Sequence, residues 1–303
     1  MKNTPLVSIA LCTYNGSEYL SIQLESILNQ TYSNLEIIIV DDQSTDSTYE
    51  LLSSYQEKYS TKIKLYQNPS NLGFIKNFER AISLCQGSLI ALSDQDDIWD
   101  KNKIAIQVNE IKNNILVYHD SLMVNEIGEP LKDSISNMKN MYSGGSPLPF
   151  LFNNCVSGHS ILMKKDLIHD IIPFPKEIFY DWWIAFRATQ VGTISYIDKK
   201  LVHYRQHEGT ITSPTLTTKS DEYISSSNIS ILKVLGSSKN RKKSMLIKTI
   251  HDLVENKKNQ LLHFKLFKLL LVNRKEIFFI SKKSSASKLN RIFKNIWSKK
   301  LHI

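Results

Sequence analysis

The chain has 303 residues, of which 42% are hydrophobic and 22% charged. This composition indicates a globular protein with enough apolar residues for a core, and it argues against an integral membrane protein. No apolar run approaches the ~18 residues of a membrane-spanning helix, and the first run is too short for a signal peptide. Three scattered cysteines argue against a disulfide scaffold. We therefore expect a cytoplasmic protein.

Charge is unevenly distributed along the chain. Residues 1–210 carry 18 Lys and Arg against 24 Asp and Glu, whereas residues 211–303 carry 20 against 5. The basic segment also places apolar residues at helical spacing, namely Leu262, Leu266, Leu269 and Leu270. Such a segment can lie on an anionic membrane surface or pack against the rest of the chain with its lysines outward. Binding to nucleic acid is a third reading, but nucleic acid is not the expected partner.

Strand and helix patterns alternate over the first hundred residues. Short apolar runs rich in β-branched residues predict strands, and apolar residues at helical spacing between them predict helices. The expected strands are residues 6–13, 35–40, 62–67 and 88–93. Strands separated by helices indicate βαβ units, and therefore an α/β fold with a mostly parallel central sheet flanked by helices.

The pattern is looser after residue 100. Asp100 can cap a helix that reaches Ile111, and a second helix is expected at 180–189. Further strands are expected at 115–124, 155–163 and 193–204. Residues 125–150 are expected to form a loop, and the Ser- and Thr-rich residues 208–228 a linker.

Polar residues gather where the predicted strands end. The four segments concerned are Thr13-Tyr14-Asn15, Asp41-Asp42, Asn71 and Asp94-Gln95-Asp96-Asp97. The carboxyl ends of parallel strands face the ligand in open α/β sheets. The sequence therefore predicts a binding site at this edge of the sheet.

The segment from Asp94 to Asp97 places three carboxylates within four residues. Like charges at this density repel each other unless a cation lies among them. Oxygen ligands suit Mg²⁺ or Mn²⁺, which bridge protein carboxylates to substrate phosphates. A solvated acidic turn is the alternative.

Asp42 follows a wholly apolar run and begins the sequence Asp-Gln-Ser-Thr-Asp. A carboxylate at a strand end can accept the imide N–H of uracil or thymine, much as carboxylates accept from other base donors. Thr13, Tyr14 and Asn15 are placed to frame the same base. Ordinary turn chemistry or helix capping is the alternative for each of them.

Together these segments resemble glycosyltransferase family 2 and its GT-A fold, a Rossmann-like α/β architecture. The resemblance covers roughly residues 5–210 and is carried by four motifs in order: residues 7–16, residues 40–48, Asn71-Leu72-Gly73-Phe74 with Asn77, and residues 93–99. The form Asp-Gln-Asp-Asp-Ile-Trp is similar to a subgroup that includes rhamnosyltransferases and related enzymes of bacterial surface polysaccharides.

The resemblance implies roles at the donor site. Asp42 would contact the base with Thr13, Tyr14 and Asn15 beside it, and Asn71 would lie near the base or ribose.

The resemblance also implies a role for each residue of the acidic segment and for Trp99. Asp94 and Asp96 would form the Asp-x-Asp pair, with Asp94 nearer the ribose and Asp96 on Mg²⁺ or Mn²⁺. Asp97 and Trp99 would border the donor sugar. A divalent cation neutralises the departing diphosphate.

Asp181, in Tyr180-Asp181-Trp182-Trp183, matches the family's catalytic base, although many members carry an acidic residue where this chain has Tyr180. Trp182 and Trp183 could desolvate the carboxylate and raise its pKa, or stack on sugar faces. The alternative is that Asp181 caps a helix and the tryptophans are core.

Two later segments match the family more loosely. In residues 202–207, Arg205 could hold phosphate oxygens and His207 could be a further metal ligand, although many members carry a Gln-x-x-Arg-Trp version instead. In residues 155–160, on the acceptor side, Gly158 could allow close backbone approach and His159 could contact the acceptor or be structural.

We therefore expect a catalytic domain over residues 1–225 and a basic amphipathic helical extension over residues 226–303. The expected reaction is inverting, metal-assisted single displacement of a sugar from a UDP- or dTDP-sugar to a surface-glycan acceptor, with lipid-linked acceptors favoured. The enzyme would then be cytoplasmic or peripheral at the inner membrane face. The rivals are a nucleotidyltransferase on a related sheet and a non-catalytic membrane-surface adaptor.

Overall fold

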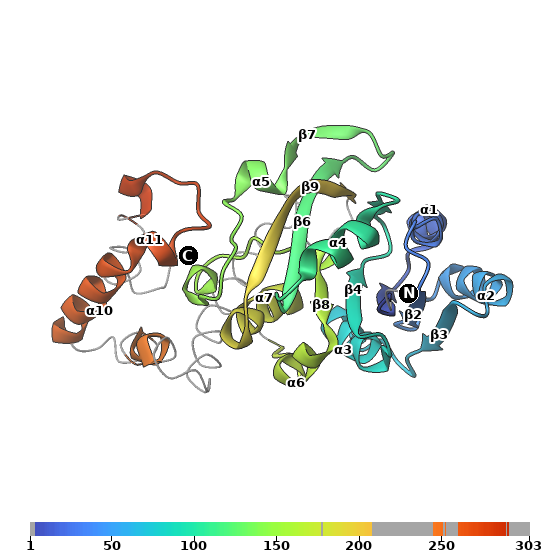
Figure 1. The fold of residues 1–303 in the computed structure, drawn as a ribbon, viewed down its shortest axis with the longest axis horizontal. Helices are drawn as coiled ribbons and strands as arrows, with labels where there is room; N and C mark the ends of the chain where they lie inside the picture. The colour runs from blue at the N-terminus through green and yellow to red at the C-terminus, as the bar shows by residue number, and fades with distance from the viewer. Residues whose placement is uncertain are drawn as a thin grey trace.

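The computed structural model describes residues 4–176, 178–207, 245–250, 252, 260–288 and 290. A mixed sheet runs through the molecule with helices packed along it. The N-terminal strands lie at one end and the C-terminal helices at the other (Figure 1).

The first half of the chain forms the predicted parallel sheet. Its strands are β1 (Val7–Thr13), β2 (Leu35–Asp41), β3 (Ile63–Gln67) and β4 (Leu89–Ser93), in the order β3-β2-β1-β4. The connecting helices are α1 (Ser17–Leu28), α2 (Thr48–Lys58) and α3 (Phe74–Leu84). Thr13 pairs with Asp41 and Leu11 with Ser93, so the polar segments after these strands meet at one edge of the sheet. The α/β prediction is confirmed.

The second half extends this sheet in mixed directions. β6 (Leu116–Val124) runs parallel to β9 (Ile194–Arg205), whereas β8 (Leu162–Lys164) lies antiparallel to both β4 and β6. The two-residue strand β5 (Ile98–Trp99) pairs antiparallel with β9. Its pairing ties the acidic segment between β4 and β5 to the C-terminal end of β9.

Short helices and turns complete this half. They are α4 (Lys103–Ile111), η1 (Leu148–Phe150), η2 (Gly158–Ser160), η3 (Lys165–Leu167), α6 (Ile168–Ile171) and α7 (Tyr180–Val191).

Two predictions for this half were wrong. Residues 125–150 are not simply a loop, because β7 (Pro130–Ser134) pairs with the edge of β6 and is followed by α5 (Ile135–Met138). The strand expected at 155–163 is reduced to β8, because residues 158–160 turn into η2. A Cβ on Gly158 would overlap the Tyr180 hydroxyl, so a larger residue in this turn would require the Tyr180 ring to shift.

The core is divided by the sheet. Successive side chains of a strand point to opposite faces, and along β1 Ala10 and Cys12 join one buried cluster while Ile9 and Leu11 join the other. The first cluster also includes much of α7 and η1.

The described part of the C-terminal extension packs on this first cluster. α10 (Gln260–Val272) and α11 (Arg274–Ile277) bury Leu266, Leu270 and Ile277 in it. The Phe278 ring stacks on Phe152 with 6.0 Å between ring centroids. The sheet and this part of the extension therefore share one core.

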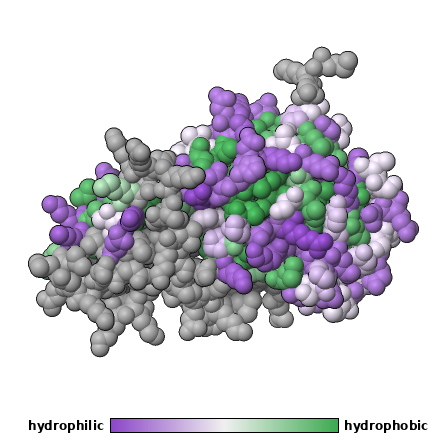
Figure 2. All heavy atoms as spheres, turned by 90° about the horizontal axis from the view of Figure 1, so that it is seen from below, coloured by the Kyte–Doolittle hydropathy of each residue, from purple (hydrophilic) through white to green (hydrophobic). Residues whose placement is uncertain are grey.

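The outer surface of the extension carries both apolar and basic side chains. Phe264 and Val272 are exposed on α10, as are Lys265 and Lys268. Figure 2 shows apolar residues gathered in the middle of the visible body, with hydrophilic residues around them. The expected linker at 208–228 and the boundary at 225 lie outside the described residues. Among the described helices, none is long and apolar enough to cross a membrane. Membrane attachment through the tail stays a prediction.

Candidate active site

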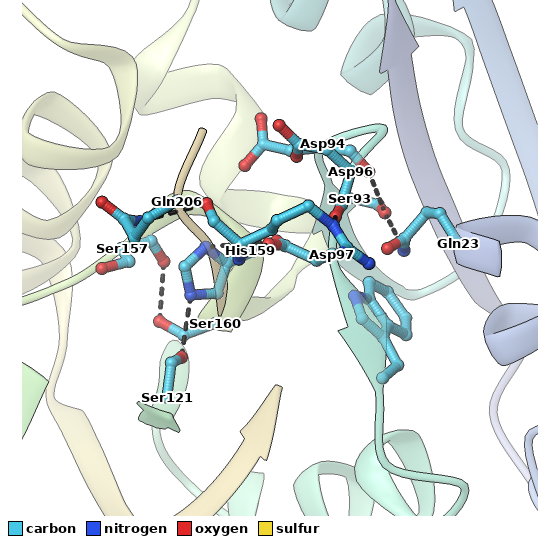
Figure 3. A network of polar contacts seen from close by, with 12 residues as sticks. Gln23, Ser93, Asp94, Asp96, Asp97, Ser121, Ser157, His159, Ser160 and Gln206 are labelled. Carbon is cyan, nitrogen blue, oxygen red and sulfur yellow. Dashed lines mark hydrogen bonds and ion pairs between the residues drawn. The ribbon is translucent and has the colours of Figure 1, made fainter. Parts of the chain in front are cut away.

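The acidic segment is held against the ends of the neighbouring strands. Gln95 accepts a hydrogen bond from the Tyr14 backbone N–H (2.8 Å) and donates one to the Tyr14 carbonyl (3.0 Å). Ser93, just before the segment, accepts from Gln23 Nε2 at 2.9 Å (Figure 3). These contacts fix the backbone that carries Asp94, Asp96 and Asp97.

Asp96 and His207 come together from distant parts of the chain. Asp96 Oδ2 lies 2.9 Å from His207 Nε2, and the two side chains remain 16% and 18% exposed. Two ligands of an octahedral ion, each about 2.1 Å from it and at right angles, are themselves about 3 Å apart. The two side chains are hydrogen-bonded to each other, and this bond raises the pKa of His207. A carboxylate oxygen and an imidazole nitrogen at this spacing would also fit adjacent positions on one divalent cation.

A second group of candidate ligand atoms lies deeper. Asp94, Asp97 and His159 each offer one atom, and these atoms lie within 4.8 Å of one another. Asp97 and His159 are buried, and so is Lys103. Burial lowers the pKa of Lys103 well below its usual range, although the Asp97 and Asp94 carboxylates act in the opposite direction. This group is therefore a second candidate for a cation, beside the Asp96–His207 pair.

His159 is held inside the protein. Its side chain is 2% exposed, and its Nε2 lies 2.8 Å from Ser121 Oγ (Figure 3). A ring buried in this way is not placed to contact an acceptor, which corrects that expectation.

Burial and mutual repulsion act on the acidic segment. Burial, followed by the Asp96 and Asp181 carboxylates, raises the pKa of Asp94 to about 8. Burial, followed by Asp96 and Asp94, also raises the pKa of Asp97 well above its usual range. A divalent cation beside them would favour their ionised forms.

Lys103 is a site residue that the sequence reasoning missed. Its side chain is fully buried, and its Nζ lies 3.1 Å from the centroid of the Trp99 ring. Its Nζ has no hydrogen-bond partner among the described residues. The signal was available, because Lys103 shares with Ile104 and Ile111 the apolar face of α4, where a charged residue is unexpected.

Asp42 lies on the side of the site where a nucleotide base is expected, and its carboxylate is hydrogen-bonded to neighbouring residues. Its Oδ1 accepts from Leu72 N–H (2.8 Å) and Asn68 Nδ2 (2.5 Å), and its Oδ2 accepts from Gly73 N–H (2.8 Å). These bonds hold the turn that presents the exposed Asn71. Asp42 is itself only 2% exposed. In this structure its carboxylate supports the turn that carries Asn71, and its contact with a base stays a prediction.

The remaining candidates on this side lie at the end of β1. Thr13 is buried and donates to Asp41 Oδ1 at 3.0 Å. Tyr14 and Asn15 are exposed beside it, and Asn15 Oδ1 accepts from Thr45 N–H at 2.8 Å. The structure thus brings these three residues to the edge where Asp42 lies.

Arg205 has a different placement from the one expected. It is 2% exposed, and its backbone N–H donates to Asp97 Oδ1 at 3.2 Å. Its Nε donates to the Asp96 carbonyl (2.8 Å), and its Nη1 donates to the Glu126 carbonyl (2.5 Å). The guanidinium therefore braces the acidic segment, which corrects the expectation that it pairs bidentately with phosphate.

Asp181 lies in the first turn of α7. The helix begins at Tyr180 with Phe179 as its N-cap residue, so the reading of Asp181 as the cap is wrong. Its Oδ1 accepts from Trp182 N–H at 2.5 Å, and the Gly158 N–H also donates to the carboxylate. Burial nevertheless dominates and raises the pKa of Asp181 to about 6, the direction that a general base near neutral pH requires.

Trp182 and Trp183 are core residues. Both are 6% exposed, and their Nε1 atoms donate to the Phe150 carbonyl (2.6 Å) and the Ile171 carbonyl (2.8 Å). This corrects the expectation that they stack on sugar faces. Trp99 is likewise buried, at 4% exposed.

The raised pKa of Asp181 predicts a pH profile. Only the ionised carboxylate can take a proton, so kcat/KM should fall below about pH 6 by about tenfold per unit. Lys139 lowers the pKa of Asp181 electrostatically. Lys139→Met should therefore raise that pKa and move the acidic limb to higher pH, whereas Lys132→Met, on the exposed β7, should not. An acidic limb at the same pH in wild type and Lys139→Met would contradict this assignment.

The fold and this edge of the sheet define the class of protein. The chain aligns over 96% of its length with the crystal structure of S. aureus TarS 1-349 in complex with UDP, covering 90% of that chain with a TM-score of 0.57 and 17% identity. It aligns over 99% of its length with the mannosyltransferase PcManGT from Pyrobaculum calidifontis in complex with GDP-Man and Mn²⁺, covering 89% of that chain with a TM-score of 0.59 and 14% identity. The architecture is the GT-A fold.

The chain belongs to Glycosyl transferase family 2, whose model matches residues 8–172. A Haemophilus influenzae uncharacterized glycosyltransferase is 28% identical over 97% of this chain and 100% of its own length. The Escherichia coli protein UDP-Glc:alpha-D-GlcNAc-diphosphoundecaprenol beta-1,3-glucosyltransferase WfgD is 28% identical over 69% of this chain and 80% of its own length. The family confirms the resemblance read from the four motifs.

Proposed function

We propose that this protein transfers one hexose or rhamnose, with inversion, from a UDP- or dTDP-sugar to a lipid-linked acceptor of surface-polysaccharide synthesis. The observation that most supports this proposal is the Asp96–His207 pair, whose Oδ2 and Nε2 atoms lie 2.9 Å apart on partly exposed side chains near Asp94. UDP is the favoured nucleotide, because WfgD is named for a UDP-glucose donor and the TarS structure holds UDP. WfgD is also named for a diphosphoundecaprenol acceptor.

The donor nucleotide is proposed to lie along the ends of β1, β2 and β4. Asp42 would read the base, with Thr13 and the exposed Tyr14 and Asn15 beside it, and Asn71 would lie near the base or ribose. The support is that the register of β1, β2 and β4 brings the segments after them to one edge, and that Asp42 accepts from the Leu72 and Gly73 N–H groups next to Asn71.

Asp96 and His207 would hold the divalent cation, Mg²⁺ or Mn²⁺, and Asp94 would face the ribose. When bound, the cation supplies positive charge against the diphosphate as the glycosidic bond breaks. The mixed oxygen and nitrogen ligands suit Mn²⁺ at least as well as Mg²⁺.

Asp181 would act on the acceptor. Its carboxylate takes the proton of the acceptor hydroxyl while that oxygen forms a bond to the anomeric carbon, and the nucleoside diphosphate leaves from the opposite side. One displacement inverts the anomeric centre. The Trp182 and Gly158 N–H groups orient the carboxylate, and its burial keeps it basic enough to accept a proton near neutral pH.

A transfer assay tests this function. UDP-glucose, with dTDP-rhamnose as the second donor, is supplied with a GlcNAc-diphospho-lipid acceptor, with Mn²⁺ or with a chelator. The proposal expects acceptor-dependent release of nucleoside diphosphate that stops in the chelator, with a product of inverted configuration. Release of pyrophosphate would favour a nucleotidyltransferase instead, and the absence of metal-dependent nucleotide binding would favour a non-catalytic adaptor.

A further inference from the structure

The helix α10 has two faces of different composition. Phe264, Lys268 and Val272 are spaced four residues apart, so they lie in one row along the helix. Phe264 and Val272 are 65% and 70% exposed, and Lys268 is exposed between them. The core residues Leu266 and Leu270 each follow a member of this row by two residues, about 200° around the helix. One face of α10 therefore packs on the protein, while the opposite face presents apolar and basic side chains outward.

The surface of the extension is strongly basic. Residues 260–290 contain seven Lys and Arg and a single acid, Glu276. Six of these basic residues are exposed, namely Lys265, Lys268, Arg274, Lys275, Lys282 and Lys283. A partner that complements this surface carries negative charge.

The apolar members of the row narrow the choice of partner. An anionic phospholipid surface accommodates both kinds of side chain, because lysines lie among the headgroups while apolar side chains enter the boundary with the acyl chains. The phosphate backbone of a nucleic acid would use the lysines but would offer Val272 no apolar surroundings. The mixed row on α10 therefore favours a lipid surface.

The extension is joined to the part of the protein that carries the proposed base. The Asn140 N–H donates to the Ile280 carbonyl at 2.9 Å, and Asn140 Nδ2 donates to the Phe279 carbonyl at 2.8 Å. Lys139, the preceding residue, lowers the pKa of Asp181 electrostatically. The segment that contacts the extension thus also acts on Asp181.

We propose that the exposed face of α10, together with the basic residues that follow it, binds an anionic phospholipid bilayer. Packing on the protein and binding to the membrane fall on opposite sides of one helix, so the two do not compete. Bilayer binding keeps the enzyme at the surface where a lipid-linked acceptor lies. This last step rests on the proposed function, whereas the binding itself does not.

The test is sedimentation of the full-length protein with phosphatidylcholine vesicles, with and without phosphatidylglycerol, at low and high salt. Wild type should bind the anionic vesicles and be released by salt. Each basic residue near an anionic surface contributes about fivefold in affinity, so Lys265→Gln/Lys268→Gln/Lys275→Gln should weaken binding by about 100-fold. Phe264→Gln/Val272→Gln should weaken it by at least about tenfold, because two apolar side chains no longer enter the bilayer.

A matched control removes the same charge elsewhere. Lys58, Lys112 and Lys199 are exposed residues outside the extension. Lys58→Gln/Lys112→Gln/Lys199→Gln should bind the anionic vesicles as wild type does. Every variant changes exposed side chains only, so melting temperatures close to that of wild type are expected throughout.

The outcomes are distinct. Lack of wild-type binding to the anionic vesicles overturns the proposal, and so does an equal loss in the triple-lysine variant of the extension and its control. Wild-type binding by Phe264→Gln/Val272→Gln also overturns it. In each case, binding of a DNA duplex that depends on the extension lysines would assign the surface to nucleic acid. Self-association that Phe264→Gln/Val272→Gln abolishes, without vesicle binding, would assign it to a second copy of the chain.

The proposed function fails separately from this inference. The vesicles carry neither acceptor nor nucleotide, so vesicle binding does not depend on sugar transfer. A protein that binds anionic vesicles but transfers no sugar in the assay described above would contradict the proposed function and leave the membrane surface in place.

Discussion

Replacing Asp181 with Asn is expected to lower kcat by about 10²–10⁴-fold while donor binding stays close to wild type. Asn has nearly the same shape, and its Oδ1 can still accept from the Trp182 and Gly158 N–H groups. The amide cannot take a proton from the acceptor hydroxyl, so only the chemical step is lost. Steady-state kinetics with a lipid-linked acceptor measures kcat, and calorimetry with UDP and Mn²⁺ measures donor-site binding.

The matched control is Asp170→Asn on α6. Asp170 is an acid of α6 whose Oδ1 pairs with Arg187 at 3.2 Å, away from the acidic segment. This variant removes a negative charge of the same kind and should retain full activity. Near-wild-type kcat in Asp181→Asn, with the acceptor saturating, would remove Asp181 from the mechanism.

Replacing Asp96 with Asn is expected to reduce metal-dependent transfer by at least about 10²-fold, comparable to the loss of one preorganised electrostatic group. The amide oxygen keeps the size of the ligand but not its charge, so the cation and the diphosphate it faces are held more weakly. The concentration of Mn²⁺ at half-maximal activity should rise together with the fall in kcat.

Asp133→Asn on the exposed strand β7 provides the charge-matched control for this variant. It should leave both the rate and the Mn²⁺ dependence unchanged. An Asp96→Asn enzyme with wild-type rate at wild-type Mn²⁺ concentration would show that the cation binds elsewhere, with Asp94, Asp97 and His159 the next candidates.

The N-terminal half of the fold was predictable because its signals are local. Apolar, β-branched runs such as residues 35–40 are buried parallel strands, and the polar residues that follow them meet at one edge. β5, β7 and η2 were not predictable in this way. β5 has only two residues and exists because β9 lies alongside it. The turn at Gly158 depends on its close approach to Tyr180, a residue more than twenty positions away.

The site was predictable in its residue types but not in its partners. The sequence singles out Arg205 as a cation near phosphate chemistry, yet its side chain is buried, with Nε donating to the Asp96 carbonyl and Nη1 to the Glu126 carbonyl. The same holds for the indole N–H groups of Trp182 and Trp183. The hydrogen-bond partners of these side chains are backbone carbonyls that are distant in sequence and come close only in the folded protein. Sequence spacing therefore cannot predict them.

The central claim is that Asp96 and His207 hold a divalent cation against the diphosphate of a nucleotide. Pulsed electron paramagnetic resonance on Mn²⁺ with UDP and the wild-type protein measures this directly, since it detects magnetic nuclei bonded to or near the ion. We expect both ³¹P couplings from UDP and a ¹⁴N coupling from an imidazole, with the ¹⁴N coupling absent in His207→Ala. A Mn²⁺–UDP complex without nitrogen coupling in wild type, or with an unchanged one in His207→Ala, would contradict the account.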